Sequence, residues 1–212
     1  MRIKSTKGME QRILNSSRHV KDPFSCKDKW DRYFGNRNPL HAELGMGRGD
    51  FLIAAASGNP GINFIGIEKY SMVIARAAGK FENTDIRNAA LVVADFKDII
   101  EITGEKTIER IYFNFPDPWP KNKHEKRRCT NGRFLSLCKK VMTQPGEIHL
   151  KTDNDDFYRY SLNSFVKSGY RILSATDDLY GSSGADGNIQ TEYERKFVSL
   201  GMKIKKIIAG SD

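Results

Sequence analysis

The sequence predicts an α/β protein built on a mostly parallel sheet that is covered by helices. From Leu40 onward, short apolar runs alternate with segments of helical periodicity, which is typical of strands joined by helical crossovers. The first apolar run ends in a glycine-rich turn, as expected where a strand of an open α/β sheet leads into a helix. A chain of 212 residues is long enough for one sizeable core. We therefore expect one domain whose sheet has six or seven strands.

The expected strands are short apolar runs bounded by turn-forming residues. They lie at residues 40–44, 63–67, 91–93, 111–115, 148–150, 171–175 and 196–200. We expect the last two to form a closing pair, because the glycine-rich segment 181–187 between them is typical of a flexible loop.

The expected helices follow from apolar residues at helical spacing. They lie at residues 51–56, 72–81, 134–141 and 155–167. Asp50 and Ser71 are expected to cap the first two, because short polar side chains accept hydrogen bonds from the first free N–H groups of a helix. Gly58, Pro145-Gly146 and Gly169 are expected to end the first, third and fourth helices.

Composition narrows the class of protein and its partners. The chain has 35 Lys and Arg against 26 Asp and Glu, and the net charge of +9 favours a polyanionic partner, although it also serves solubility. No apolar run is long enough for a signal peptide or a membrane span, so we expect a soluble protein with no membrane partner. Residues 1–30 hold scattered basic residues and are interpreted as a basic N-terminal arm, followed by one domain over residues 31–212.

The cysteines indicate a reducing compartment. Cys26, Cys129 and Cys138 are odd in number and include no C-x-x-C pair, which argues against a disulfide framework and favours the cytoplasm. His124 and Cys129 are poor metal ligands in this context, so we expect no metal site. The sequence is compatible with a monomer or a homodimer.

The first glycine-rich turn follows Glu43 and contains Gly45, Gly47 and Gly49, which let the backbone approach a ligand closely. A dinucleotide-binding turn would need a third glycine where Asp50 stands. Glu43 would also repel a pyrophosphate and attract a cationic cofactor, and S-adenosylmethionine carries such a cation. The turn therefore disfavours a nicotinamide dehydrogenase and favours a methyltransferase.

Acidic residues end three successive predicted strands. Glu68 stands where a carboxylate can accept the hydroxyls of a ribose, and Asp95 stands where the amino group of an adenine would lie. Each acid taken alone is explained as well by a solvated loop. Their shared position at strand ends, beside Glu43, is what predicts a cofactor site.

A proline-rich segment, Asn114-Phe-Pro-Asp-Pro-Trp-Pro-Lys121, follows the fourth predicted strand. Proline disfavours helical geometry in the residue before it, so we expect Phe115, Asp117 and Trp119 to be extended. A carboxylate and an indole shown together are suited to a planar, hydrogen-bonding ring. The basic residues that follow would hold its phosphates, which predicts a nucleobase within a nucleic acid. Two alternatives stay open, a Trp119 packed as a lid and a basic run that is only a solvated face.

These residues resemble the bacterial tRNA (guanine-N(7)-)-methyltransferases, the TrmB family, over roughly Trp30 to the C-terminus. The matching motifs are Phe34-Gly-Asn36, Glu43-Leu-Gly-Met-Gly-Arg-Gly49, Ile67-Glu-Lys69, Phe115-Pro-Asp-Pro-Trp-Pro-Lys121, Lys126-Arg-Arg128, Lys151-Thr-Asp153 and Thr191-Glu-Tyr-Glu194. The proline-rich motif and the last motif are specific to this family, whereas the glycine turn belongs to methyltransferases in general.

The resemblance implies a Rossmann-like class I S-adenosylmethionine-dependent methyltransferase fold, with a mostly parallel seven-stranded sheet and helices on both faces. It implies transfer of a methyl group from S-adenosylmethionine to ring nitrogen 7 of a variable-loop guanine of tRNA. The residues implied for the cofactor are Glu43, Gly45, Gly47, Glu68, Asp95 and Asp117, the last also at the reaction centre. Those implied for the target nucleotide are Lys121, Asp153, Thr191, Glu192, Tyr193 and Glu194, and those for RNA are Lys123, His124, Lys126, Arg127 and Arg128.

The chemistry of ring nitrogen 7 agrees with this. That atom has a lone pair and no proton to lose, so its attack on a sulfonium methyl needs no general base, and alignment can supply about 7–11 kcal/mol. Asp117 would either accept hydrogen bonds from the N–H edge of guanine or offset the positive charge that grows on the ring.

Two further functions remain as alternatives. A methyltransferase for exocyclic amino groups of adenine or cytosine also places an acid and prolines after the fourth strand, but it has two adjacent prolines where this chain has one between Asp117 and Trp119. A basic RNA-binding module without catalysis is disfavoured by the presence of Glu43, Glu68 and Asp117.

Overall fold

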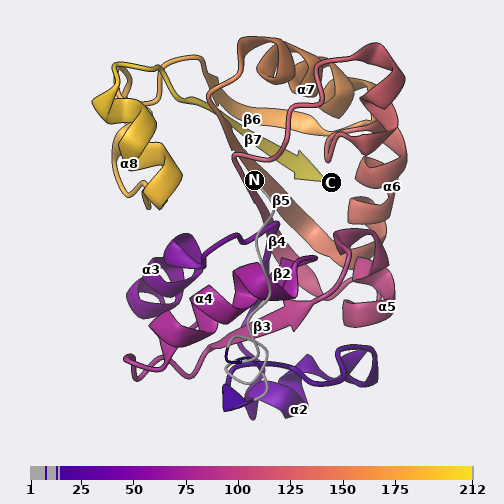
Figure 1. The fold of residues 1–212 in the computed structure, drawn as a ribbon. Helices are drawn as coiled ribbons and strands as arrows, with labels where there is room; N and C mark the ends of the chain where they lie inside the picture. Colours follow the sequence, from indigo (N-terminus) through magenta and orange to yellow (C-terminus); the bar gives the residue numbers. More distant parts are fainter. Residues whose placement is uncertain (1–7, 9–12, 14, 212) are drawn as a thin grey trace. The chain divides into compact units, whose positions relative to one another are not determined.

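The computed structural model describes residues 8, 13 and 15–211, and it divides into two compact units (Figure 1). The first unit ends at Gly104 and the second begins at Glu105. Among the described residues, the first unit holds three strands and the second holds four. The predicted α/β class and the upper predicted number of strands are confirmed.

The strands of the first unit are β1 (Leu40–Leu44), β2 (Asn63–Glu68) and β3 (Ala89–Val93), which run parallel in the order β3-β2-β1. Every residue of β1 is buried, as are the first five of β2. Parallel strands are covered on both faces, so they appear in a sequence as continuous apolar runs. This explains why the sequence located all three within two residues of their observed ends.

The first unit also contains short helical elements. They are η1 (Phe24–Cys26), α2 (Trp30–Phe34), α3 (Asp50–Gly58), α4 (Ser71–Phe81), η2 (Phe96–Asp98) and α5 (Ile99–Thr103), where η denotes a 3-10 helix. Both α3 and α4 pack against β2 and β3 (Figure 1). The sequence predicted only these two.

Both predicted N-caps of the first unit were wrong by one residue. Gly49, with a φ of +77°, precedes α3, and Tyr70 precedes α4; neither cap makes a side-chain hydrogen bond. Asp50 instead forms an ion pair with Lys80 at 2.5 Å. The left-handed glycine lets the chain enter α3 directly from the turn, which leaves no extended position for a polar cap.

Part of the predicted N-terminal arm is packed on the first unit. The N–H of Leu91 donates to the Arg18 carbonyl at 2.7 Å, and the N–H of Val20 donates to the Leu91 carbonyl at 3.0 Å, so these residues extend the edge of β3. The buried Trp30 indole donates to the Ile102 carbonyl at 3.0 Å. The basic residues Arg2, Lys4, Lys7 and Arg12 lie outside the described residues. The boundary at residue 30 stays a prediction.

The strands of the second unit are β4 (Ile108–Asn114), β5 (Met142–Thr152), β6 (Arg171–Thr176) and β7 (Lys205–Ser211), in the order β4-β5-β7-β6. β4 is parallel to β5, and β7 is antiparallel to both β5 and β6. The helices are η3 (Asn122–Arg127), α6 (Gly132–Val141), α7 (Asp155–Lys167), η4 (Ser183–Ala185) and α8 (Glu192–Ser199). α6 and α7 pack against each other and against β5 (Figure 1).

Two predicted elements of the second unit were wrong. Residues 196–200 belong mostly to helix α8, and the closing strand is β7, further along the chain. Pro145-Gly146 does not separate α6 from the fifth strand, because β5 begins at Met142. The pairing of β5 with β4 passes from Met142 directly to Glu147, so residues 143–146 have no partner in β4, while Gly146 still pairs with Ser211 of β7.

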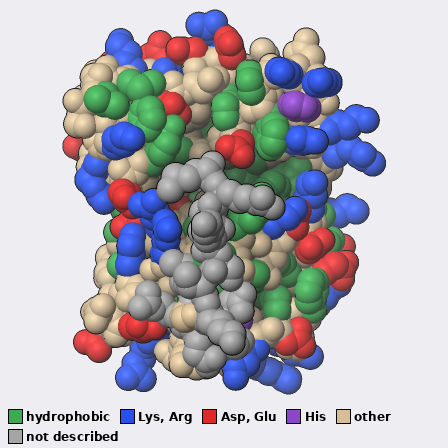
Figure 2. All heavy atoms as spheres, in the orientation of Figure 1, with side chains coloured by type: hydrophobic (Ala, Val, Ile, Leu, Met, Phe, Trp, Pro, Cys, Tyr) green, Lys and Arg blue, Asp and Glu red, His purple; other side chains and the backbone are tan. Residues whose placement is uncertain are grey.

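The described residues show how charge, apolar helices and cysteines are distributed. On the face shown in Figure 2, Lys and Arg side chains are interspersed with Asp and Glu, so the net charge of +9 is not gathered into one uniform patch there. Within residues 8, 13 and 15–211, no helix is both long and apolar enough to cross a membrane. Cys26, Cys129 and Cys138 are free thiols.

Gly49→Ala should destabilise the first unit. A Cβ at this position would lie 3.0 Å from the Ala77 Cβ, and the φ of +77° is one that alanine adopts poorly. We expect the free energy of unfolding to fall by about 1–3 kcal/mol, measured by denaturant titration with circular dichroism. Gly58→Ala is the matched control, because its Cβ would meet nothing within 4 Å at an ordinary φ. Equal free energies of unfolding for the two variants would show that position 49 does not require glycine.

Candidate functional site

The glycine turn after β1 is held by the end of β2. The N–H groups of Gly45 and Met46 both donate to the Ile67 carbonyl, at 2.8 and 3.2 Å, and that of Gly47 donates to Glu68 Oε2 at 3.3 Å. These three amides are therefore engaged within the protein. A pyrophosphate would need such N–H groups for itself, so the geometry supports the sequence argument against a dinucleotide.

The same turn leaves room for a ligand. A Cβ at Gly45 or Gly47 would meet nothing within 4 Å, and Glu43 lies just before the turn, 2% exposed. An open backbone surface beside a buried acid suits a ligand with an apolar body and a positive charge. The residues present thus fit S-adenosylmethionine.

Glu68 ends β2 and takes part in two turns. Its Oε2 accepts the Gly47 N–H, and its Oε1 accepts the Tyr70 N–H at 3.1 Å. A carboxylate oxygen has more than one lone pair, so these bonds leave acceptor capacity for hydroxyl groups. Glu68 therefore shapes the glycine turn, and its predicted contact with a ribose stays a prediction.

Asp95 follows β3, and its carboxylate is partly exposed. It accepts from the Lys97 N–H at 3.1 Å and pairs with Lys69 Nζ at 3.1 Å. Burial acts to raise its pKa, but the Lys97 N–H and the Lys69 ammonium outweigh burial, and the pKa of Asp95 is lowered. Asp95 is thus ionised at neutral pH and able to accept from an amino group. The first unit brings Glu43, the glycine turn, Glu68 and Asp95 to the carboxyl ends of β1, β2 and β3.

The backbone of the proline-rich loop in the second unit differs from the extended conformation that the sequence predicted. Phe115 has a φ of +54° and Trp119 a φ of +43°, so neither is extended. Proline disfavours the right-handed helical region in the residue before it, and both residues lie on the left-handed side rather than in the extended region that was predicted. Bulky residues at positive φ are strained by about 1–3 kcal/mol each, and such residues cluster at functional sites.

Contacts from the second unit hold both strained residues. The Phe115 N–H donates to the Lys151 carbonyl at 2.9 Å, and its ring lies 5.0 Å from that of Tyr193. The Trp119 carbonyl accepts from Nε and Nη2 of Arg128, at 3.2 and 3.1 Å. Arg127 lies over the Trp119 ring at 4.8 Å. The loop is therefore fixed at both ends, with Asp117 between them.

Asp117 is exposed and makes no hydrogen bond or ion pair with any described residue. A strained loop that presents a solvent-exposed carboxylate is a feature that clusters at functional sites. Its geometry is suited to a ligand with N–H groups or positive charge.

The basic segment after this loop is not uniform. Lys121, Lys123 and Lys126 are exposed, whereas the Arg128 guanidinium holds Trp119 and stacks on Tyr160 at 4.2 Å. His124 meets the Trp119 ring edge-on at 5.5 Å. Trp119 is therefore packed by its own segment. The assignment of Arg128 and the other predicted RNA contacts, Lys123, His124, Lys126 and Arg127, stays a prediction. Arg128 has a structural role in any case, because it holds the Trp119 carbonyl.

The motif Thr191 to Glu194 forms the first turn of α8. The Thr191 hydroxyl accepts from the Glu194 N–H at 2.9 Å, and Glu194 Oε2 accepts from the Thr191 N–H at 3.2 Å, which is a capping box. Glu194 is fully buried and pairs with Lys151 Nζ at 2.6 Å. Glu192 and Tyr193 are exposed. The predicted nucleotide contacts of these residues stay predictions.

Tyr193 connects the capping box to Asp153, which directly follows β5. Its hydroxyl lies 3.5 Å from Asp153 Oδ2, and its ring stacks on Phe197 at 4.1 Å. The sequence assigned roles to Asp153 and Tyr193 but none to Lys151, Tyr180 or Asn188, all of which contact Glu194. Lys151 lies in the matching motif Lys151-Thr-Asp153, but no local pattern marks the contact of these three residues with Glu194, because they come from separate segments.

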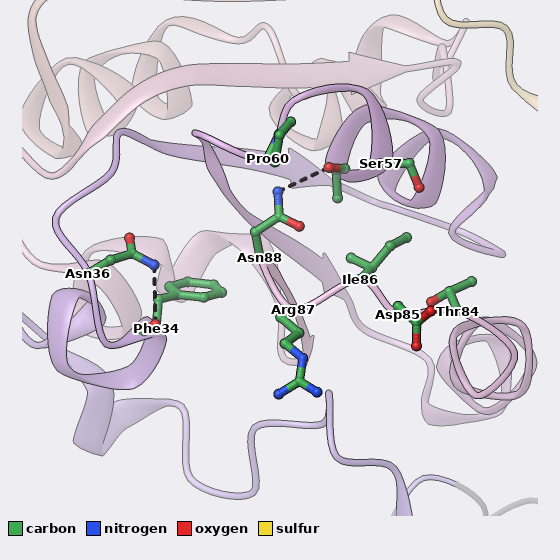
Figure 3. A pocket seen from close by; sticks show the side chains of 10 residues that line it. Phe34, Asn36, Ser57, Pro60, Thr84, Asp85, Ile86, Arg87 and Asn88 are labelled. Carbon is green, nitrogen blue, oxygen red and sulfur yellow. Dashed lines mark hydrogen bonds between the residues drawn. The ribbon is translucent and has the colours of Figure 1, made fainter.

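A hollow of about 510 Å³ lies elsewhere in the first unit (Figure 3). Its wall includes Phe34, Pro60, Arg87 and Asn88. None of the predicted site residues lines it. The amide of Asn88 ties the wall together by donating to the Ala56 carbonyl at 3.0 Å. Among the described residues, no group of three or more His, Cys, Asp or Glu side chains could hold a metal ion.

Comparison with known proteins identifies relatives along almost the whole chain. The family described as "Putative methyltransferase" matches residues 37–207. A tRNA (guanine-N(7)-)-methyltransferase of Lachnoclostridium phytofermentans is 41% identical over 209 residues, covering 99% of this chain and 98% of that protein. One from Geobacillus sp. is 42% identical over 205 residues, covering 96% and 93%.

Solved structures show the fold. A 16S rRNA methyltransferase, KamB, is similar with a TM-score of 0.65 at 9% identity, covering 86% of this chain and 92% of that one. A SAM-dependent methyltransferase from Aquifex aeolicus has a TM-score of 0.58 at 13% identity, covering 95% and 97%. The chain therefore has the Rossmann-like class I methyltransferase fold.

Glu68→Ala should weaken S-adenosylmethionine binding while tRNA binding is retained. The variant loses a charged acceptor for the ribose and leaves the Gly47 and Tyr70 N–H groups without their partner. A hydrogen bond to a charged group contributes about 1.5–3 kcal/mol, so we expect the Kd in calorimetry to rise by about ten- to a hundredfold. Glu82→Ala, at the exposed end of α4, is the control. An unchanged Kd for Glu68→Ala would remove this residue from the cofactor site.

Proposed function

Because the chain belongs to the family of tRNA (guanine-N(7)-)-methyltransferases, we propose that it methylates ring nitrogen 7 of a guanine in the variable loop of tRNA. The observation that carries the chemistry is Asp117, an exposed acid without an internal hydrogen bond, between two strained residues. The names of the curated relatives support guanine rather than the exocyclic amino groups of adenine or cytosine.

The cofactor of the reaction is S-adenosylmethionine, which supplies an electrophilic methyl group when bound. Glu43 and the open surface of Gly45 and Gly47 would hold its cationic part, Glu68 its ribose, and Asp95 its adenine amino group. One structural neighbour, a phosphoethanolamine N-methyltransferase of Haemonchus contortus with a TM-score of 0.52, was solved in complex with S-adenosyl-L-methionine.

Alignment is the main task of the protein in this reaction. The nucleophilic nitrogen has no proton to lose, so no residue needs to act as a general base. Asp117 would face the target ring, where its negative charge stabilises the positive charge that develops on the ring as the methyl group arrives. A rigid loop serves this because a preorganised carboxylate needs no rearrangement during the reaction.

The tRNA would contact the second unit around the same loop. Lys121, Lys123 and Lys126 are exposed beside Asp117 in the sequence and are suited to phosphates. Asp153 and Tyr193 would contact the target nucleotide. We include a cytoplasmic location in this proposal, since the substrate is tRNA, and either a monomer or a homodimer is compatible with it.

Nucleoside analysis tests the proposed function. Unmodified tRNA is incubated with the protein and S-adenosylmethionine and then digested, and the modified nucleoside is identified by mass spectrometry and mapped by sequencing. The expected product is 7-methylguanosine in the variable loop. Methylation of adenine or cytosine, or no methylation at all, would overturn the proposal.

Asp117→Asn is nearly isosteric and should preserve folding and cofactor affinity. If the charge of Asp117 stabilises the transition state, kcat and kcat/KM should fall together, by about 100-fold or more. If Asp117 only holds the guanine edge, KM rises and kcat is retained. Single-turnover methylation at saturating tRNA distinguishes these results. Parental values of both constants would remove Asp117 from the reaction centre.

Replacing Lys123 and Lys126 together by Gln should weaken tRNA binding and flatten its dependence on salt. Each phosphate contact contributes about 0.7–0.9 to the slope of log K against log salt, so we expect the slope to fall by about 1.4–1.8. Lys140→Gln with Lys167→Gln removes the same charge from exposed positions elsewhere in the second unit and should leave the slope nearly unchanged. Equal slopes in both double variants would show that the segment is only a solvated face.

A further inference from the structure

We propose that the buried Lys151–Glu194 ion pair positions Tyr193 and Asp153 to read the N–H edge of the target guanine, and that Glu194 acts through Lys151 rather than by touching the nucleotide. This inference rests on the proposed function. It assigns a positioning role to Lys151, Tyr180 and Asn188, and it revises the role that the family resemblance implies for Glu194.

The Glu194 carboxylate is occupied by the protein itself. Oε2 accepts from Lys151 Nζ at 2.6 Å and from the Thr191 N–H at 3.2 Å. Oε1 accepts from the Tyr180 hydroxyl at 2.7 Å and from Asn188 Nδ2 at 2.8 Å. A carboxylate has about four acceptor positions, so this one has no good position left for a nucleotide.

The Lys151 ammonium is equally engaged. It donates to Glu194, to the Ile189 carbonyl at 2.8 Å and to Asn188 Oδ1 at 3.3 Å. The side chains of Lys151 and Glu194 are 5% and 0% exposed. Burial acts to raise the pKa of Glu194, but Lys151, Tyr180 and Asn188 outweigh it, and the pKa is lowered. The pair is therefore ionised, and removing either partner leaves a buried charge.

The pair joins the segments that carry the predicted nucleotide contacts. Lys151 lies two residues before Asp153 in β5, and its carbonyl holds the Phe115 N–H of the Asp117 loop. Glu194 directly follows Tyr193 in α8. Fixing Lys151 to Glu194 therefore fixes Tyr193 beside Asp153 and Phe115, where the hydroxyl lies 3.5 Å from Asp153 Oδ2 and the rings 5.0 Å apart.

This arrangement selects for guanine. The Tyr193 hydroxyl lies 3.5 Å from Asp153 Oδ2 and donates toward it, which leaves the other carboxylate oxygen for the nucleotide. Guanine presents two adjacent N–H donors on its Watson–Crick edge, whereas adenine presents a ring acceptor beside its amino group. A fixed carboxylate thus favours guanine and opposes adenine.

A double-mutant cycle tests whether Glu194 acts through Lys151. Lys151→Met, Glu194→Gln and the double variant are compared in single-turnover methylation of tRNA. We expect each single change to lower kcat/KM by about 10- to 100-fold. The kcat/KM of the double variant should equal that of the less active single variant, because both changes remove the same interaction. Multiplying losses would mean that Glu194 has an independent task at the nucleotide, and the proposal would be wrong.

The matched control is an exposed pair of the same unit. Arg159 and Asp156 on α7 are 3.9 Å apart, with side chains 73% and 92% exposed. Arg159→Met, Asp156→Asn and their combination should leave kcat/KM essentially unchanged, because exposed pairs contribute little. A loss equal to that of the buried pair would show that the second unit responds to any lost charge and would overturn the assignment.

A second cycle keeps the test decisive if Lys151→Met does not fold. Tyr180→Phe removes one hydrogen bond to Glu194 and leaves no buried charge without a partner. We expect it to lower kcat/KM in the parent chain and to have no further effect in the Glu194→Gln background. The same loss in both backgrounds would contradict the proposal.

The titration of Tyr193 gives a readout that needs no activity. Burial and then Asp153 raise the pKa of Tyr193. In Glu194→Gln the ring should leave Asp153, and its pKa should fall toward the ordinary value of tyrosine. The pKa of Tyr193 is measured by NMR of tyrosine-labelled protein as pH is raised, and its signal is identified as the one that is missing in Tyr193→Phe. An unchanged pKa would contradict the positioning role. Failure of the parent chain to form 7-methylguanosine would overturn the proposed function separately, because the titration does not depend on it.

Discussion

Two bulky residues at positive φ form the constraint on which the second unit depends. Phe115 and Trp119 are held in strained conformations on either side of Asp117, at a cost of about 1–3 kcal/mol each. Lys151 holds the first through its carbonyl, and Arg128 holds the second through its guanidinium. The aromatic contact of Phe115 with Tyr193 then connects the loop to α8. The loop, the end of β5 and the first turn of α8 are thus parts of one arrangement.

In the first unit, the main feature at the carboxyl ends of the strands is the glycine turn after β1. The N–H groups of the glycine turn are satisfied by Ile67 and Glu68, so the turn presents an open surface rather than a set of donors. Such a surface beside the buried Glu43 suits a cationic nucleoside cofactor, whereas phosphate-binding turns keep their N–H groups for the ligand. The same glycines can therefore serve either ligand class, and their hydrogen bonds decide which.

The basic segment 121–128 shows that neighbouring charges in a sequence can have separate tasks. Arg128 folds back onto the Trp119 carbonyl and the Tyr160 ring, and Arg127 lies over Trp119. Lys123 and Lys126 face solvent. Charge alone would assign all of them to RNA, but a planar guanidinium can also hold a carbonyl and stack on a ring. The lysines are therefore the better candidates for phosphate contacts.

The sequence alone determined the α/β class, the strand of residues 40–44 and the helix of residues 155–167, because buried parallel strands and amphipathic helices have local patterns. It also contained the capping box of Thr191 and Glu194, a signal for helix α8 that was missed when residues 196–200 were predicted to be a strand. Only the tertiary structure decided that Glu194 pairs with Lys151, 43 residues away, and that Phe115 and Trp119 take positive φ. Such contacts join separate segments, and the strain they hold in place has no periodicity or spacing that a sequence can show.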